Sequence, residues 1–235
     1  MTALPRAILF DLDDTLIHAY ARPQVAWLAV AEELAAAIAP LTPAAASAAI
    51  TAHARDFWAD HERHRLWRQR LGEARREIVA DALPGLISAE AATRLADRFT
   101  AWREERMHLF EGAHETLDAL KAAGVLLALV TNGAAESQRP KVERFDLARR
   151  FDHIQIEGEH GFGKPEERAY RHAMAALGVE ARDTWMVGDH LEWEIAAPQR
   201  LGIFAIWHDA LAEGLPADSP VKPDRIIRSL AELLE

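Results

Sequence analysis

Acidic, hydroxyl and lysine side chains follow several short apolar runs of this chain, close to the points where those runs end. These polar groups are, in chain order, Asp11-Leu12-Asp13-Asp14-Thr15, Thr131-Asn132-Gly133, Gly163-Lys164-Pro165 and Gly188-Asp189. If the apolar runs are parallel strands, their carboxyl ends meet at one edge of a sheet, which is where open α/β sheets bind ligands. The sequence therefore predicts one crevice that gathers carboxylates, a hydroxyl and a lysine.

The residue types in this crevice favour phosphate chemistry. Clustered carboxylates repel one another unless a cation neutralises them, and oxygen ligands without His or Cys suit a hard ion such as Mg²⁺. A carboxylate beside that ion can attack phosphorus and form an aspartyl-phosphate intermediate. Thr131 and the amides of Asn132 and Gly133, which precede a predicted helix, are placed to hold phosphate oxygens. Lys164 would offset the added negative charge, which completes the parts needed for phosphoryl transfer.

The elements that must position these groups alternate between strand and helix. Buried strands are predicted at 7–10, 125–130, 153–156, 184–187, 203–206 and 225–227. Helices are predicted at 112–123, 135–144, 166–178, 192–201 and 229–235. Strands that are separated by helices of this length form crossover units and a largely parallel sheet. The fold class is therefore α/β, with a Rossmann-like parallel sheet.

Residues 17–109 have a different character and predict an inserted helical domain. This segment is rich in Ala, Leu, Glu and Arg, which favour helix, and prolines and a Pro-Gly pair divide it into three or four helices. We expect no strand in it. It contains as many arginines as acidic residues, so the rest of the chain carries the net negative charge. The predicted division is an α/β core of residues 1–16 and 110–235 and a helical domain of residues 17–109.

Composition excludes several classes of function. The 235 residues include 27 basic and 37 acidic side chains, a formal net charge of −10, and no cysteine. A disulfide framework, a thiolate metal site and a cysteine nucleophile are therefore excluded, and net acidity argues against a nucleic-acid partner. The apolar run at 125–130 is too short to span a bilayer. No basic-then-apolar leader precedes the first strand, so we expect a cytoplasmic protein without membrane contact.

The ordered motifs resemble those of the haloacid dehalogenase (HAD) superfamily, in its phosphatase branch. The matching residues are Asp11-x-Asp13-x-Thr15, Thr131, Lys164 and Gly188-Asp189, which together span the predicted core. The resemblance implies that Asp11 is the nucleophile and a metal ligand. It implies that Asp13 is the general acid and base, with its backbone carbonyl on Mg²⁺, and that Asp189 is the third protein ligand. Thr131, Asn132 and Lys164 would bind the substrate phosphate.

The resemblance also implies a cap and shows one departure. An insertion between the first two motifs is, in this superfamily, a helical cap that closes over the site. Related sequences usually have a second aspartate five residues after the metal-binding one, whereas this chain has Glu194 there, with Glu192 nearby. A glutamate is one methylene longer than an aspartate, so its carboxylate can be placed differently around the metal ligands. Which of Glu192 and Glu194 supports the metal site is left open.

Several reactions of the superfamily are separated by single residues. Dehalogenases lack the second aspartate of the first motif, so Asp13 favours a phosphatase, and the phosphonatase lysine has no counterpart because 17–109 contains no lysine. A phosphosugar mutase and a non-catalytic phosphate-binding protein remain as alternatives. The spacing from Thr131 through Gln138, Lys141 and Lys164 is similar to that of pyrimidine 5′-nucleotidases and N-acylneuraminate-9-phosphatases. Phosphoglycolate or another small organic phosphate is an alternative substrate. The predicted partner is a small-molecule phosphate ester, and the oligomeric state is left open.

Three histidines in the predicted helical domain invite comparison with a metal site. His61 and His64 are three residues apart on a predicted helix, and His53 is nearby in the sequence. We expect them on a solvated helix face, because no carboxylate-rich surroundings accompany them. The tryptophans of the same segment are expected to pack its interior rather than to stack on a ligand.

Overall fold

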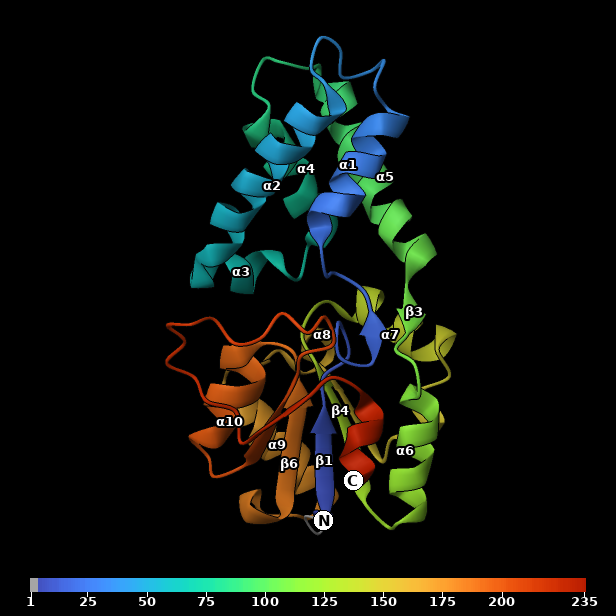
Figure 1. Cartoon of the computed structure of the whole chain (residues 1–235), viewed down its shortest axis with the longest axis vertical. Helices are drawn as coiled ribbons and strands as arrows, with labels where there is room; N and C mark the ends of the chain where they lie inside the picture. Colours follow the sequence, from blue (N-terminus) through green and yellow to red (C-terminus); the bar gives the residue numbers. More distant parts are fainter. Residues whose placement is uncertain (1–3) are drawn as a thin grey trace. The chain divides into compact units, whose positions relative to one another are not determined.

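A computed structural model of the chain describes residues 4–235 and contains a parallel six-stranded sheet (Figure 1). In spatial order the strands are β5 (His153–Ile156), β4 (Leu126–Thr131), β1 (Ala7–Phe10), β6 (Thr184–Gly188), β7 (Phe204–His208) and β8 (Arg225–Ile227). Each neighbouring pair is parallel. The α/β fold class and the six predicted strands are confirmed, with each strand within two residues of its predicted bounds.

The position of β1 at the centre of the sheet explains the meeting of the motifs. Strand β1 pairs with β4 on one side and with β6 on the other, so Phe10 lies opposite Leu129 and Val187. All four residues of β1 are fully buried, as expected of a strand covered on both faces. The residues that follow β1, β4 and β6 therefore emerge side by side at one edge of the sheet.

Helices cover both faces of this sheet. One face is packed by α9 (Glu167–Leu177) and α10 (Ala197–Gln199), whose apolar side chains join Leu9, Ala128 and Met186 of the strands in one cluster. Leu127 and Leu129 alternate with this set and point to the opposite face. That face is covered by α6 (Ala113–Ala122) and the C-terminal 3₁₀ segment Leu230–Leu234, which contact each other (Figure 1).

The remaining helices of the core are short. Helix α7 (Ala135–Arg144) follows β4, α8 (Glu157–His160) follows β5, and 3₁₀ turns at Ala148–Arg150 and Ala181–Asp183 precede β5 and β6. The helix expected at 192–201 has a different form: a π-helical turn, Leu191–Ala196, leads into the three-residue α10. The expected helix at 229–235 is a 3₁₀ segment that begins with a capping box between Ser229 and Glu232. These two differences concern the type of helix rather than its place.

The described residues divide into two compact units, one of residues 4–18 and 108–235 and the other of Ala19–Met107. The second unit consists of α1 (Pro23–Glu33), α2 (Pro43–Ala59), α3 (His61–Trp67), α4 (Leu71–Ala82) and α5 (Ala89–Arg106). It has an apolar cluster of its own, in which Trp27 stacks on Phe99. The unit therefore has five helices rather than the three or four expected. One break that the sequence analysis missed is Asp60, whose side chain accepts the Arg63 amide and begins α3 directly after α2.

The expectation of no strand in 17–109 is wrong at the two ends of that segment. Ile17–His18 (β2) and His108–Leu109 (β3) form an antiparallel ribbon, with His18 opposite His108 and their rings stacked. Each strand has only two residues, too few for an alternating pattern to be visible in the sequence. The ribbon brings the beginning and the end of the insertion together.

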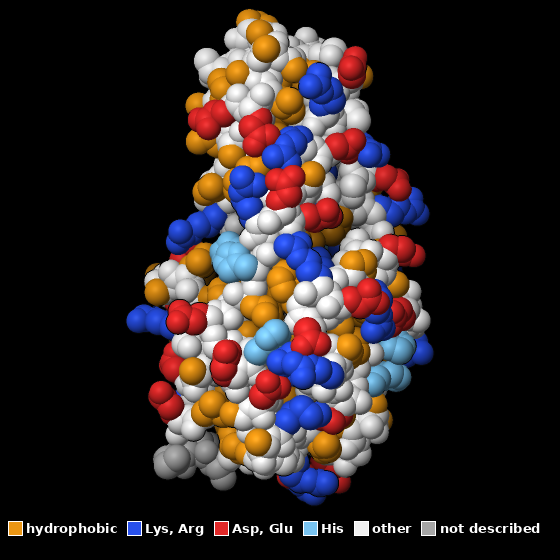
Figure 2. All heavy atoms as spheres, turned by 90° about the vertical axis from the view of Figure 1, so that its right-hand side faces the viewer, with side chains coloured by type: hydrophobic (Ala, Val, Ile, Leu, Met, Phe, Trp, Pro, Cys, Tyr) orange, Lys and Arg blue, Asp and Glu red, His pale blue; other side chains and the backbone are white. Residues whose placement is uncertain are grey.

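None of the helices formed by residues 4–235 combines the length and the apolar character needed to cross a bilayer. On the face drawn in Figure 2, basic and acidic side chains are interspersed. No continuous basic stripe is visible on that face.

Candidate active site

Asp11 and Lys164 form the buried centre of the candidate site. Asp11 directly follows β1, and its Oδ1 lies 2.5 Å from Lys164 Nζ. The Lys164 side chain is fully buried, and Asp11 is only 7 % exposed. The same Nζ atom lies 2.8 Å from Glu194 Oε1, so one lysine is shared by two buried carboxylates. The sequence predicted that Asp11 and Lys164 meet, and the structure brings them into direct contact although they are 153 positions apart.

Asp189 joins this centre from the end of β6. Thr15 Oγ1 lies 3.2 Å from Asp11 Oδ2 and 3.4 Å from Asp189 Oδ1, so the hydroxyl bridges the two carboxylates. The main chain of Asp189 is fixed by Trp207, whose indole nitrogen donates to the Asp189 carbonyl over 2.7 Å. Two of the three predicted metal ligands therefore stand together at neighbouring strand ends.

The electrostatics of this group call for additional positive charge. Burial raises the pKa of Asp11 to about 7 although Lys164 acts in the opposite direction. Burial, reinforced by the charges of Glu194, Asp11 and Asp14, raises the pKa of Asp189 well above its ordinary value. Burial also raises the pKa of Glu194. Three acidic groups share one lysine, an arrangement that a divalent cation would relieve.

Asp13 lies beside this centre and is held by helix α7. Lys141 Nζ lies 2.8 Å from each Asp13 carboxylate oxygen, and Gln138 Nε2 donates to Asp13 Oδ2 over 2.9 Å. Gln138 also donates to Thr131 Oγ1 over 2.6 Å, so the predicted phosphate-binding hydroxyl is tied to the same helix. The sequence analysis found Gln138 and Lys141 only as part of a subgroup pattern. Gln138 and Lys141 are three residues apart on a helix that begins just after Asn132-Gly133. This spacing indicates that both side chains lie on the same face of the helix.

Asn132 and Gly133 form a brace for the loop that carries Lys164. The Asn132 side chain donates to the Lys164 carbonyl and accepts from the Lys164 amide, both over 2.8 Å. The Gly133 amide donates to Glu157 Oε2 over 2.9 Å. The amide of Gly133, expected to face a phosphate, is thus engaged by Glu157, a residue that the sequence analysis missed.

The structure distinguishes the two glutamates that follow Asp189. Glu194 is 1 % exposed, contacts Lys164, and accepts the His190 amide over 2.8 Å. Glu192 instead pairs with Arg200 over 2.8 Å, and the side chain of Glu192 is 39 % exposed. Glu194 therefore belongs to the buried group, and Glu192 to the surface.

Comparisons with known proteins agree with this arrangement. The profile of haloacid dehalogenase-like hydrolases matches residues 5–202. The phosphoserine phosphatase of Thermus thermophilus is 35 % identical over 178 residues, which are 75 % of this chain and 65 %, just under two thirds, of that protein. The glyceraldehyde 3-phosphate phosphatase of Pyrococcus furiosus is 26 % identical over 232 residues, 98 % of this chain and 92 % of that protein.

A solved structure of the same architecture is that of the HAD-hydrolase YfnB from Bacillus subtilis, bound to magnesium. It superposes with a TM-score of 0.75 at 22 % identity and covers 98 % of this chain and 97 % of that one. At this identity the likeness shows the fold alone, and the profile match carries the assignment. This chain belongs to the haloacid dehalogenase-like hydrolases.

Proposed function

We propose that this chain is a Mg²⁺-dependent phosphatase that hydrolyses a small-molecule phosphomonoester through an aspartyl-phosphate intermediate on Asp11. The observation that carries the proposal is the buried contact of Asp11 with Lys164, placed between Thr15 and Glu194. A binding protein without catalytic activity has no need to bury a carboxylate at this cost in desolvation. A nucleophile that must attack an anionic phosphate benefits from such a site.

The residues of the site fit a magnesium ion. The donors that would hold it are the carboxylates of Asp11 and Asp189 and the main-chain carbonyl of Asp13, all of them hard oxygen ligands. When bound, the ion would neutralise the charge of the substrate phosphate and of the carboxylates around it. Burial raises the pKa of Asp11 and of Asp189, and a cation bound beside them would stabilise their charged forms. Glu194 would support this group through Lys164 and the His190 amide.

The chemical steps assign one role to each residue of the first motif. A carboxylate oxygen of Asp11 forms a bond to phosphorus while the bond from phosphorus to the ester oxygen breaks. Asp13 gives a proton to the departing oxygen, which leaves as an alcohol. Water then attacks the phosphorus of the aspartyl phosphate, Asp13 takes the proton of that water, and inorganic phosphate and free Asp11 are produced. Lys164, Thr131 and the main chain at Asn132 would hold the phosphate oxygens during both steps.

The names of relatives support a small substrate. Phosphoserine and glyceraldehyde 3-phosphate, after which the two relatives above are named, are small phosphate esters. A third relative, the N-acylneuraminate-9-phosphatase of Rattus norvegicus, is 30 % identical over 158 residues, 67 % of this chain and 63 % of that protein, and is also named after a small phosphate ester. Asp13 distinguishes the proposed reaction from dehalogenation, which needs no acid for an ester oxygen. We therefore propose a phosphomonoester of this size and no macromolecular substrate.

A panel of phosphomonoesters tests the proposal directly. Phosphate release from phosphoserine, glyceraldehyde 3-phosphate, N-acylneuraminate 9-phosphate, a phosphosugar and p-nitrophenyl phosphate should depend on Mg²⁺ and disappear with excess EDTA. Asp11→Asn should lower kcat by at least about 10²-fold, because the amide is a poor nucleophile of nearly the same shape. The matched control is Asp218→Asn, at an exposed loop position, which should keep the wild-type rate.

Two results would overturn the proposal. Full activity in EDTA would exclude the metal-dependent step, and an Asp11→Asn variant with near wild-type turnover would place the chemistry on another residue. Isomerisation of the phosphosugar without net phosphate release would indicate the mutase alternative instead.

A further inference from the structure

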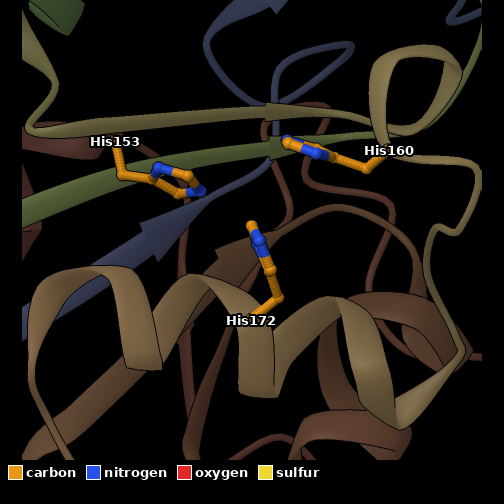
Figure 3. A group of neighbouring side chains, drawn as sticks. All are labelled: His153, His160 and His172. Carbon is orange, nitrogen blue, oxygen red and sulfur yellow. The ribbon is translucent and has the colours of Figure 1, made fainter.

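Three histidines from separate elements meet at the edge of the sheet. His153 lies on the edge strand β5, His160 ends α8, and His172 lies on α9. Figure 3 shows the three rings converging on one space. One ring nitrogen of each lies within 4.8 Å of a ring nitrogen of the other two. The sequence analysis did not identify this group, because no two of its members share an element.

Two of these rings have a buried nitrogen without a hydrogen-bond partner. The Nε2 atoms of His153 and His160 are both buried, and neither has a partner among residues 4–235. A buried polar atom left unpaired is costly and needs an explanation.

The third ring is held in the orientation that a metal ligand requires. Gln155 Nε2 donates to the Ala169 carbonyl over 3.0 Å, and this bond fixes the orientation of the buried Gln155 amide. Gln155 Oε1 then faces His172 Nδ1 at 2.8 Å, so Nδ1 must carry the proton and donate it. The lone pair of His172 is therefore on Nε2. A carbonyl oxygen that orients a histidine in this way is the usual outer partner in histidine-metal sites.

We propose that His153, His160 and His172 bind a divalent transition metal of the Zn²⁺ type, at a site separate from the carboxylate centre. Imidazole nitrogens suit Zn²⁺, Ni²⁺ or Cu²⁺ rather than Mg²⁺. Zinc-nitrogen bonds of about 2 Å place tetrahedral ligands roughly 3.4 Å apart. The three nitrogens, which now lie within 4.8 Å of one another, would therefore draw together by at most about 1.4 Å. A fourth position remains for water.

The surroundings of the three histidines favour a neutral ligand, such as water, at the fourth coordination position of the metal. The nearest carboxylate in sequence, Glu159, is engaged by Arg139 through contacts of 2.6 and 2.7 Å. Phe162 packs against His160 and His172. A bound ion would join β5, α8 and α9, and His160 stands only four residues before Lys164. The segment from Glu157 to Lys164 is already held at Glu157 by the Gly133 amide and at Lys164 by Asn132. A metal ion bound by His160 would hold the same segment at a third residue.

Metal titration separates this site from the carboxylate centre. The Asp11→Asn/Asp189→Asn double variant removes two oxygen ligands of the other site. Calorimetry should still find one equivalent of Zn²⁺ bound to it, and Co²⁺ should give the strong visible bands of a tetrahedral nitrogen site. Adding His160→Gln or His172→Gln to this variant should weaken Zn²⁺ binding by more than the roughly 10- to 100-fold that loss of an outer partner costs. His61→Gln, at an exposed position of the helical unit, is the matched control and should leave binding unchanged.

A second measurement uses the unmodified chain and does not depend on the folding of any variant. The ring ¹⁵N resonances of His153, His160 and His172, read by NMR, should shift on addition of Zn²⁺, and those of His61 should stay unchanged. Absence of Zn²⁺ binding at micromolar concentrations, or shifts that do not include these three residues, would overturn the proposal. So would a Zn²⁺ stoichiometry that His160→Gln and His172→Gln leave unaltered.

Discussion

The Asp13 carboxylate is held from α7 by one charged and one neutral donor. Lys141 contacts both of its oxygens, and Gln138 links it to Thr131. These contacts fix the direction of the group that we propose as acid and base. Because proton transfer requires hydrogen-bond distance to the reacting oxygen, such fixing matters as much as the identity of the acid.

Lys141→Met should therefore reduce catalysis without removing a reacting group. We expect kcat to fall roughly 10- to 100-fold, as for a modest misplacement of a catalytic group, with a smaller change in KM. Lys141→Arg should recover part of the loss, because it restores a cation on the same helix face. Steady-state kinetics on the best substrate of the panel measures both effects. Lys121→Met is the matched control, since Lys121 pairs with Asp152 over 2.7 Å outside the site. Equal losses in the two methionine variants would contradict the assignment.

Single residues were predictable from the sequence where chain order alone places them. Asp11 and Asp189 directly follow buried strands and Thr131 is the last residue of one, so a parallel sheet necessarily brings them to one edge. Glu157 and the choice of Glu194 over Glu192 were not predictable in this way. Their roles depend on how a short helix and a π-helical turn are rotated about their axes, and a local pattern does not fix that rotation.

At the scale of elements, the end of β6 depends on close packing between a glycine and a folded-back side chain. The π-helical turn Leu191–Ala196 directs Glu194 across the last residue of β6, Gly188. A Cβ atom at Gly188 would lie 2.0 Å from Glu194 Cγ and 2.5 Å from Glu194 Cβ. Only glycine leaves room for this arrangement. Wide turns of this kind recur at functional sites.

Gly188→Ala should consequently affect both stability and activity. Overpacking of a filled interior costs about 1–3 kcal/mol, and relief of the clash requires Glu194 to leave Lys164. We expect a lower midpoint of urea unfolding and a lower kcat in the same variant. Gly72→Ala is the control, because a Cβ there meets nothing within 4 Å and Gly72 lies in α4. A Gly188→Ala variant as active and as stable as Gly72→Ala would show that the contact has no functional weight.

The carboxyl end of β7 contains a buried histidine that makes stability depend on pH. His208 is 3 % exposed and packs against Phe110. Burial lowers its pKa to about 4, although backbone hydrogen bonds with Thr15 and Arg228 act in the opposite direction. The unfolded chain would protonate the same ring near pH 6.5. Between these values the unfolded state binds more protons, so the stabilisation is complete above about pH 6.5 and is lost as the pH falls towards 4.

His208→Gln should remove this part of the pH dependence. From the difference in pKa, His208 contributes up to about 3 kcal/mol to the loss of stability between pH 6.5 and 4. The free energy of unfolding of the variant should therefore fall less steeply over this interval than that of the wild-type protein. Urea denaturation at several pH values gives both slopes, and His61→Gln serves as the exposed control. Parallel curves for wild type and His208→Gln would rule out a contribution from this ring.

The elements that were predictable are those in which every residue has the same kind of surroundings. The four central strands, β4, β1, β6 and β7, are short and almost wholly buried apolar runs, and the alternation of strands with helices along the chain indicates a parallel sheet. The two-residue ribbon and the start of α3 were missed, because each depends on one hydrogen-bonded pair or one capping side chain. The histidine group of β5, α8 and α9 was missed for a related reason. It exists only after three separate elements have packed together.

At the scale of the whole molecule, the helical unit enters and leaves the core through one ribbon. His18 and His108 are paired across the ribbon, and the Phe110 amide donates to the Leu16 carbonyl over 3.0 Å. Within the helical unit, buried Arg103 donates to the carbonyls of Ala19 and Ala21, which ties its last helix to its first residues. Each unit also has its own apolar cluster. We propose that the core supplies the reaction and that the helical unit determines which phosphate ester is accepted.

The geometry of the ribbon makes this division testable by excision. Replacing Ala19–Met107 with Asn-Gly would join His18 to His108 through a two-residue turn, the connection that antiparallel strands prefer. We expect the shortened chain to keep Mg²⁺-dependent hydrolysis of p-nitrophenyl phosphate, at a reduced rate, because Asp11, Asp13, Lys164 and Asp189 all lie outside the excised segment. The preference for the best natural ester over p-nitrophenyl phosphate, as a ratio of kcat/KM values, should fall towards one. The shortened chain carrying Asp11→Asn is the control and should be inactive. If the folded shortened chain kept the full preference of the intact protein, selectivity would have to lie in the core.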